Sequence, residues 1–220
     1  MKLLLGTSSP AKIERLHTLL DGLPVDLMHP SDVGPEPDQD EGEDSLLENA
    51  AAKAVAWSRA YSVATIATDG GLVIPALAGT WNPVRSRRAA GPSASDAERA
   101  AYVLGLAAHL TGEDRTTYRV EAAALADEHG VLVGTWEAVS DPSPLADSYD
   151  PRAVPAGFYF PGILLFNRRR YGDLDAAERQ ATHSHWERLR GPLRQAVTAL
   201  AAREPGQGSL ATRPSAPSST

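Results

Sequence analysis

Short apolar runs and helical periodicities alternate along the chain, separated by polar segments rich in glycine and proline. The first apolar run, residues 2–5, predicts a buried strand, and apolar residues then recur with helical spacing over residues 13–20. Ser9 and Pro10 are typical of the N-cap and the first position of a helix. The chain is therefore expected to begin with a strand, a polar turn and a helix.

The same two periodicities predict the elements that follow. A sharp turn at residues 69–71 is expected between two strands, which places Asp69 at the end of the first, and residues 127–130 are expected to close a hairpin. Ser45 and Glu48 form a capping box at the start of a helix. The predicted strands cover residues 24–28, 63–67, 72–77, 118–126, 131–139 and 158–166, and the predicted helices cover residues 45–60, 99–110, 174–189 and 192–203.

Length and composition predict one domain. The chain has 220 residues, of which 42% are hydrophobic, and this suffices for one substantial core. We expect that domain to cover residues 1–203. Residues 204–220 are polar and rich in proline, serine and glycine, so they are predicted to be a disordered tail.

Charge and cysteine content narrow the classes of function. A net charge of −7 and a pI near 5.4 argue against broad binding of nucleic acid, so a small molecule is the expected partner. Without cysteine the chain has no disulfide, thiolate metal site or cysteine nucleophile. The first apolar run is too short for a signal peptide, and no run of about 18 apolar residues occurs, so we expect a cytoplasmic protein without membrane contact.

The polar turn before the first helix is a candidate phosphate site. Thr7, Ser8 and Ser9 place hydroxyls where the free N–H groups and the macrodipole of a helix N-terminus favour an anion, and Lys12 adds an ammonium. An ordinary capped turn beside a solvated lysine fits the same residues and is the commoner case. The turn alone leaves both interpretations open.

Lysine is rare in this chain, three residues against 18 arginines, and two of the three accompany other polar candidates. Asn49 and Lys53 lie one turn apart on the same face of a predicted helix. With Lys12 and Asp69 they suit a polyphosphate bound with magnesium, because Mg²⁺ combines a few carboxylates with water and phosphate oxygens. Asp69 is the candidate for holding the metal and for orienting or deprotonating a water.

Three segments have a distinctive order and spacing: TSSPAK at residues 7–12, ENAAAKA at residues 48–54 and ATDGGL at residues 67–72. They resemble the T-G-N-x-x-K, E-N-A-x-x-K-A and A-D-D-S-G-L motifs of the inosine triphosphate pyrophosphatase family (ITPase-like, RdgB), and the second is the most specific. The resemblance covers residue 2 to about residue 200. It implies an α/β fold with an elongated mixed β-sheet and flanking helices in two lobes around a central cleft, dependence on Mg²⁺ and a homodimer.

The resemblance also implies roles for individual residues. Glu41 falls on the family's metal-binding glutamate, and Asp69 falls on its general-base aspartate, which we also expect to hold the metal. The family's S-A-R segment loosely matches residues 86–88. The substrate-binding residues implied in this way are Thr7, Ser8, Ser9, Lys12, Asn49, Lys53, Gly70, Ser86, Arg88, Phe158, Arg179, His185 and Trp186.

In the C-terminal half, the sequence departs from the family motifs at the segments that bind the base. The G-F-G-Y-D-P segment corresponds to GFYFPG at residues 157–162, where Pro161 replaces the aspartate that reads the purine edge. The E-K-N-A-x-S-H-R helix corresponds to residues 178–186, where Arg179 replaces the lysine and Trp186 replaces the last arginine. The groups expected to bind phosphate and metal therefore persist better than those expected to read the base.

Further departures concern stacking and the reaction itself. Phe158, Tyr159 and Trp186 are candidates for stacking on a base or another flat group, and packing in the core explains them equally well. Thr68 replaces the first aspartate of A-D-D-S-G-L, and residues 8–9 replace Gly-Asn in the phosphate loop. Either change is expected to slow turnover or to abolish it.

The leading hypothesis is a diverged, Mg²⁺-dependent nucleotide pyrophosphohydrolase, which cleaves between the α and β phosphates and has lost the preference for inosine and xanthosine. A second hypothesis is a catalytically impaired nucleotide-binding or regulatory protein. A third is a Maf-like nucleotide pyrophosphatase, because the tripeptide SSP after the first strand also occurs in that family.

Overall fold

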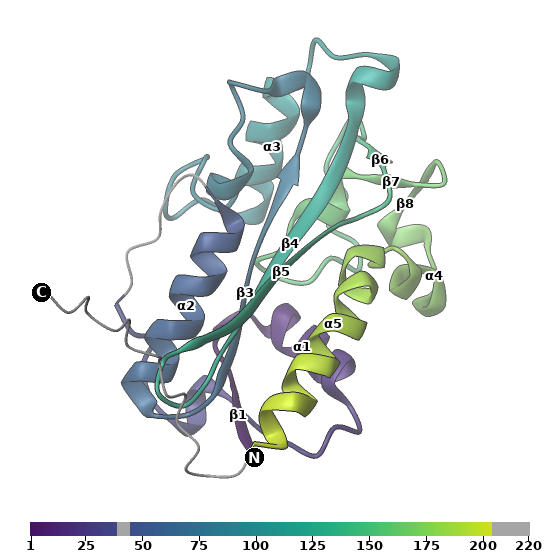
Figure 1. Cartoon of the computed structure of the whole chain (residues 1–220). Coiled ribbons are helices and arrows are strands. Elements are labelled where there is room, and N and C mark those ends of the chain that lie inside the picture. Colours follow the sequence, from purple (N-terminus) through teal and green to yellow (C-terminus); the bar gives the residue numbers. More distant parts are fainter. Residues whose placement is uncertain (39–44, 204–220) are drawn as a thin grey trace, which may run out of the picture.

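The computed structural model describes residues 1–38 and 45–203, so Glu41 and the predicted tail lie outside the described residues. Helices flank one main mixed sheet, and two short strands near the C-terminal end form a second, separate sheet (Figure 1). The strands are β1 (Lys2–Leu5), β2 (Asp26–Met28), β3 (Thr65–Val73), β4 (Thr116–Ala126), β5 (Leu132–Val139), β6 (Ser143–Pro144), β7 (Leu165–Phe166) and β8 (Arg169–Arg170). The α-helices are α1 (Pro10–Leu20), α2 (Leu46–Tyr61), α3 (Asp96–Leu106), α4 (Ala176–Ala181) and α5 (Ser184–Ala201). In the described ranges, no helix is both long and apolar enough to cross a membrane.

The main sheet has the strand order β2-β1-β3-β4-β5, and β6 pairs with β4. β1 is parallel to both of its neighbours, β2 and β3, whereas the pairs β3–β4 and β4–β5 are antiparallel. β4 and β5 are the two strands of the predicted hairpin. The expected α/β fold, with a mixed sheet and flanking helices, is confirmed.

Helices cover both faces of this sheet (Figure 1). On one face, Ala50 and Ala54 of α2 lie in a buried cluster with Ala122 of β4, and the small side chains let the helix approach closely. On the other face, Leu16 of α1 and Leu189 of α5 belong to a cluster that includes β1 and the alternate residues of β4. Successive strand residues point to opposite faces, so each face has its own core.

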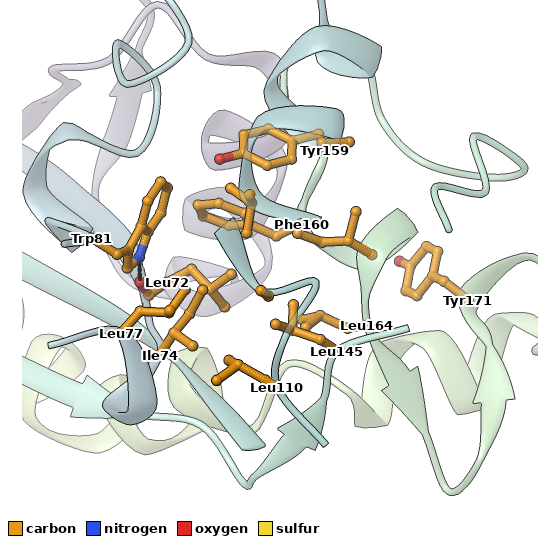
Figure 2. Close-up of a cluster of buried hydrophobic side chains, with 14 of the residues drawn as sticks. Leu72, Ile74, Leu77, Trp81, Leu110, Leu145, Tyr159, Phe160, Leu164 and Tyr171 are labelled. Atoms are coloured by element: carbon orange, nitrogen blue, oxygen red, sulfur yellow. Dashed lines mark hydrogen bonds between the residues drawn. The ribbon is translucent and has the colours of Figure 1, made fainter. Parts of the chain in front are cut away.

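A third buried cluster lies beyond the end of β1, where β3 and β4 continue into a second lobe (Figure 2). Most of its side chains are aliphatic, and aromatic side chains pack among them, including Trp81, Phe160 and Tyr171. The indole N–H of Trp81 donates to the carbonyl oxygen of Leu72 at 2.5 Å, which ties the segment after β3 back onto the strand. β3 and β4 extend beyond the end of β1, and this extension gives the two-lobed arrangement.

The predicted turn at residues 69–71 is wrong, because β3 runs without interruption through these residues. Gly70 pairs with Glu121, and Gly71 pairs with Val120. A Cβ atom at Gly70 would lie 2.2 Å from a carboxylate oxygen of Glu121, and one at Gly71 would lie 2.3 Å from the carbonyl oxygen of Pro83. The glycines therefore permit close approach of neighbouring groups rather than a reversal of the chain, and Asp69 lies in the middle of a strand.

The C-terminal elements also differ from the prediction. Residues 158–166 form a 3-10 helix (Phe160–Ile163) and the short strand β7, because this apolar run fills the third cluster instead of joining the main sheet. The helix predicted over residues 174–189 is divided into α4 and α5. α5 continues through Pro192, since burial of its apolar stripe outweighs the hydrogen bond that proline cannot donate.

Replacing Trp81 with phenylalanine tests the link between β3 and the second lobe. The Trp81→Phe variant leaves the carbonyl of Leu72 without its indole donor in a buried place, which costs about 1–3 kcal/mol. We expect its free energy of unfolding in urea to fall by at least about 1 kcal/mol more than that of Trp136→Phe. Trp136 is only partly buried. Equal losses in the two variants would contradict a stabilising role for the hydrogen bond.

Candidate functional site

The candidate site lies where β1 ends and β3 continues. β1 pairs with β3 only through Leu4 and Leu5, so the edge of β3 beyond Ile66 faces the turn after β1 and the start of α1. A cavity of about 400 Å³ occupies this place. Its walls include residues of the turn, of α1, α2, β3 and β4, of the segment 84–99 and of the segment 157–160.

Most of the predicted site residues that lie in the described ranges line this cavity. They come from segments far apart in the sequence, and the fold brings them together at one edge of the sheet. The predicted residues in the cavity wall are Thr7, Ser8, Ser9, Lys12, Lys53, Asp69, Gly70, Ser86, Arg88, Phe158 and His185.

Asp69 is held by two side chains of α2. The ammonium of Lys53 lies 3.1 Å from Oδ1, and the amide of Asn49 donates to Oδ2 at 3.2 Å. Ser45 caps this helix by accepting from the backbone N–H of Glu48, so residues 49 and 53 lie on its first turns, facing β3. Asn49 is buried behind Asp69 and positions its carboxylate, whereas Asp69 and Lys53 line the cavity.

A second ion pair faces the same cavity. The ammonium of Lys12 lies 3.0 Å from Oε1 of Glu121 and also donates to the carbonyl oxygen of Thr68 at 3.4 Å. The Glu121 side chain is only 4% exposed. Burial raises the pKa of this carboxyl, and the nearby Lys12 opposes that change by stabilising the charged form.

The two carboxylates approach the cavity from opposite faces of the sheet. Asp69 pairs with Ala122 in the β3–β4 ladder, while Glu121 pairs with Gly70, so the two acids stand at successive positions. Asp69 points towards α2 and Glu121 towards α1. Both reach the cavity because it lies at the open edge of β3, where neither face is closed off.

The turn before α1 keeps the features expected of an anion site. Ser9 is the N-cap residue, yet its side chain makes no capping hydrogen bond, and the first turn of α1 contains no acidic residue. The backbone N–H of Ser9 donates to the hydroxyl of Thr7 at 3.2 Å. The hydroxyls of residues 8 and 9 and the positive end of the helix therefore face the cavity.

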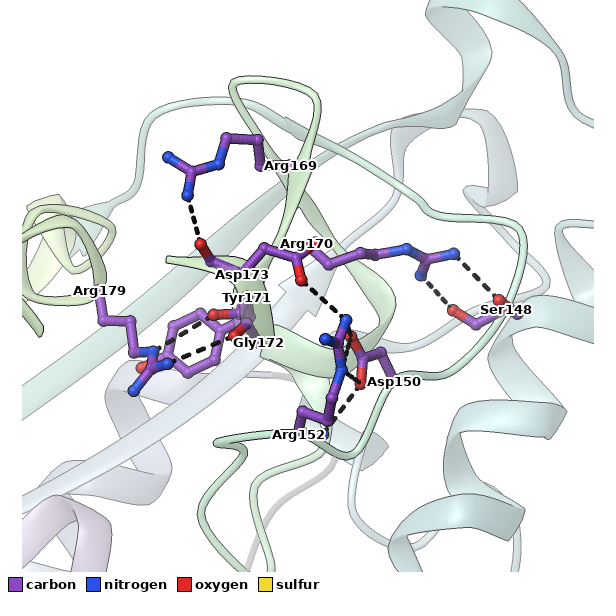
Figure 3. A network of polar contacts seen from close by, with 9 residues as sticks. All are labelled: Ser148, Asp150, Arg152, Arg169, Arg170, Tyr171, Gly172, Asp173 and Arg179. Carbon is purple, nitrogen blue, oxygen red and sulfur yellow. Dashed lines mark hydrogen bonds and ion pairs between the residues drawn. The ribbon is translucent and has the colours of Figure 1, made fainter. Parts of the chain in front are cut away.

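Two predicted base-reading residues lie elsewhere. Arg179 stacks on the ring of Tyr171 and donates to the backbone carbonyls of Tyr171 and Gly172 at 3.3 and 3.5 Å (Figure 3). Trp186 is 5% exposed and packs in the core beneath α1 and α5. Neither residue lines this cavity, because backbone carbonyls engage Arg179 and core packing engages Trp186. Trp186 instead borders a second, small cavity together with Lys12 and Phe158. Phe160 is in the cavity wall, and Pro161 is not.

Sequence reasoning missed two charged residues of β4. Arg119 and Glu121 both line the cavity, and both are buried. Their signal was the presence of two charged residues in an apolar strand segment, TYRVEAAALA, where a buried strand ordinarily carries none.

The charge of the cavity is opposite to that of the chain. Among the described residues, three carboxylates line it against six cationic side chains, namely Lys12, Lys53, Arg87, Arg88, Arg99 and Arg119. The wall therefore carries a net charge of +3, in a protein whose net charge is −7. Such a concentration of positive charge in a concave site attracts a polyanion.

The described residues contain no group of three or more His, Cys, Asp or Glu that fits a metal ion. Mg²⁺ needs no such group, because it is usually held by one or two carboxylates together with waters and substrate phosphates. The exposed edge of the Asp69 carboxylate and the neighbouring oxygens of the cavity fit that requirement, whereas they do not fit a metal site made by protein ligands alone.

Comparison with known proteins identifies a family. A model of the Ham1 family matches residues 3–188. The dITP/XTP pyrophosphatase of Mycobacterium tuberculosis is 32% identical over 208 residues, which cover 91% of this chain and 97% of that protein. The dITP/XTP pyrophosphatase of Thermus thermophilus is also 32% identical, over 91% of this chain and 98% of its own length.

Solved structures show the same fold. A HAM1 protein from Coxiella burnetii superposes with a TM-score of 0.73 at 24% identity, over 89% of this chain and 99% of that one. A nucleoside-triphosphatase, or dITP/XTP pyrophosphatase, from Mycobacterium abscessus superposes with a TM-score of 0.67 at 27% identity, over 86% and 96% of the two chains.

Because Lys12 pairs with the buried Glu121, we expect the stability of a Lys12 variant to depend on pH. The Lys12→Met substitution removes the ammonium and leaves the buried carboxylate of Glu121 without its counter-charge. This change raises the pKa of Glu121 further. When the pKa of a carboxyl is higher in the folded than in the unfolded state, the free energy of unfolding falls as pH rises through the folded-state pKa. The loss of unfolding free energy caused by Lys12→Met should therefore be larger at pH 8 than at pH 5, by about 1 kcal/mol or more.

Urea unfolding at the two pH values measures this effect. The control places Lys12→Met in a Glu121→Gln background, where the buried carboxylate is absent and the loss should not depend on pH. The same pH dependence in both backgrounds would show that Glu121 is not its source.

Proposed function

The chain belongs to the Ham1 family, and from this and the cavity we propose that it hydrolyses a nucleoside triphosphate to the monophosphate and pyrophosphate. The similar proteins from Mycobacterium tuberculosis and Thermus thermophilus are named dITP/XTP pyrophosphatases, which supports this class of reaction. The observation that carries the proposal is the cationic cavity that holds a carboxylate, Asp69, beside a helix N-terminus.

In this proposal the triphosphate lies against the turn at residues 7–9, the start of α1 and the ammonium groups of Lys12 and Lys53. Both lysines pair with carboxylates in the structure, so their charge becomes available to phosphate as those pairs loosen. Three arginines of segment 84–99, namely Arg87, Arg88 and Arg99, also line the cavity and add positive charge to its wall. Together these groups match a ligand with three or four negative charges.

The reaction follows from the position of Asp69. A water next to its carboxylate gives a proton to it as the water oxygen bonds to the α-phosphorus, and the bond from that phosphorus to the bridging oxygen of the β-phosphate breaks. Asn49 and Lys53 hold the carboxylate in place for that transfer. Mg²⁺, held by Asp69 and by the predicted ligand Glu41, would neutralise phosphate charge.

We propose further that the base specificity differs from inosine and xanthosine. Pro161 offers no acceptor side chain, and Arg179 and Trp186 make contacts outside the cavity. Each lost hydrogen bond to a charged group weakens discrimination by about 1.5–3 kcal/mol. Dependence on Mg²⁺, a homodimer and a cytoplasmic location stay predictions that accompany this proposal.

Replacing Asp69 with asparagine tests the reaction. Asp69→Asn removes the proton acceptor and keeps the shape, so pyrophosphate release from a panel of nucleoside triphosphates with Mg²⁺ should fall at least about a hundredfold. Asp26→Asn, a change at an exposed aspartate of β2, is the matched control and should retain activity. Turnover of Asp69→Asn near that of the control would refute the assignment. Binding of triphosphates without any turnover by the natural chain would favour the non-catalytic hypothesis.

The three lysines allow a matched test of phosphate binding. Lys53→Ala should weaken binding of a triphosphate at least about tenfold and leave binding of the corresponding nucleoside little changed, because only the triphosphate carries the charge that Lys53 offsets. Lys2→Ala, at an exposed residue remote from the cavity, should change neither. Calorimetric titration of both ligands measures the effect. An equal loss for nucleoside and triphosphate would indicate altered folding instead.

A further inference from the structure

Arg119 is a buried charged residue for which the proposed reaction has no use. It lies on β4, its residue surface is 3% exposed, and it forms part of the cavity wall. Its Nη2 donates to the carbonyl oxygen of Thr182 at 2.5 Å, and its guanidinium lies over the ring of Phe166, 5.1 Å from the ring centre. These contacts fix one side of the guanidinium.

Two of the three guanidinium nitrogens have N–H groups that are not satisfied. Nε and Nη1 of Arg119 have no hydrogen-bond partner among the described residues, and no carboxylate in those residues pairs with it. Asp141 attracts it at longer range and pairs with Arg188 instead. Burial lowers the pKa of Arg119 to about 10, so the group stays charged at neutral pH.

The neighbouring histidines do not supply a counter-charge. Burial and nearby arginines lower the pKa of His183 to about 3 and that of His185 to about 2, so both rings are neutral at physiological pH. Nδ1 of each ring also lacks a hydrogen-bond partner among the described residues. The inner end of the cavity therefore holds one uncompensated positive charge with unused donors.

Arg119 lies away from the groups assigned to phosphate. It stands two residues before Glu121 on the same face of β4, which separates it by about 7 Å along the strand from the pair Lys12–Glu121. Phe158, Tyr159 and Phe160 line the cavity as well and offer flat apolar surfaces. A ligand whose phosphates contact the lysines would thus direct its base towards Arg119 and the aromatic segment.

We propose that Arg119 makes the site selective for nucleotides whose base carries a negative charge, through the pair of parallel N–H groups that Thr182 leaves complete, namely Nη2–H together with either Nε–H or Nη1–H. This inference rests on the proposed function. Hydrogen bonds between two charged groups are about twice as strong as those between neutral groups, and a guanidinium matches two oxygens with two parallel bonds. A neutral carbonyl accepts from the same donors without offsetting the buried charge. The charged oxygens that fit two parallel bonds belong to a carboxylate on the ring.

Two matched pairs of triphosphates test this preference. 5-Carboxycytidine triphosphate differs from cytidine triphosphate by a carboxylate at C5, and orotidine triphosphate differs from uridine triphosphate by a carboxylate at C6. Calorimetry on the full chain, with Ca²⁺ in place of Mg²⁺, measures dissociation constants without requiring turnover. We expect the charged member of at least one pair to bind about tenfold or more tightly than its partner.

Variants of Arg119 decide whether this residue is responsible. Arg119→Met should bring the two dissociation constants of the responding pair to within about twofold, while Arg119→Lys should keep a reduced preference, since an ammonium cannot form both parallel bonds. Arg190→Met, a change at an arginine that pairs with Glu187 on the outer surface of α5, should keep the full preference. If Arg119→Met does not fold, a fall of at least about threefold in the ratio for Arg119→Lys supports the proposal, and an unchanged ratio overturns it.

The remaining outcomes separate this inference from the function on which it rests. Binding of all four triphosphates without preference by the natural chain, or an unchanged ratio in Arg119→Met, overturns the inference and leaves the proposed function standing. Failure of every triphosphate to bind overturns the proposed function, and the inference with it.

Discussion

The antiparallel pairing of β3 with β4 determines where the charged groups of the cavity lie. Because Gly70 faces Glu121 and Asp69 faces Ala122, the two acids alternate between the faces of the sheet, and each meets a lysine from the helix on its own face. A slip of one residue in this register would exchange the two faces. A slip of β4 would then turn Glu121 towards α2, in place of the alanines that this helix packs upon. Packing of the core and placement of the charges thus enforce the same register.

The edge of β3 is accessible to a ligand because β1 ends early. Continued pairing of β1 would cover the edge of β3 and bury four charged groups without access to a ligand. Because β1 stops at Leu5, the chain turns through polar residues into α1, and Lys12 reaches the carbonyl of Thr68, where a further strand would otherwise pair. Within each ion pair the lysine and the carboxylate compensate each other's charge, so the partly buried lysines are tolerated before an anion arrives.

Local patterns of the sequence predicted much of this arrangement and failed where tertiary contacts decide. The strand 2–5, the helix that follows it and the hairpin of β4 and β5 follow from periodicity, and the ENAAAKA segment brought Asn49 and Lys53 to Asp69 as its helical spacing suggested. Two consecutive glycines predicted a turn, because nothing local shows that Glu121 and Pro83 crowd them from outside. Arg179 and Trp186 were predicted by motif position, and the structure places them in aromatic and core contacts that only the folded chain provides.

Buried charge explains why the two halves of the cavity differ. At the phosphate end the partly buried ion pairs Lys12–Glu121 and Lys53–Asp69 balance their charges within the protein, so this end is stable without a ligand. At the inner end Arg119 has a backbone acceptor and an aromatic ring but no anion among the described residues, and desolvation of an unpaired guanidinium is a standing cost to the fold. A chain selected for stability alone would place an apolar side chain there, as β4 does at its inward alanines. Retention of a charged residue at that cost is expected where the ligand supplies the counter-charge.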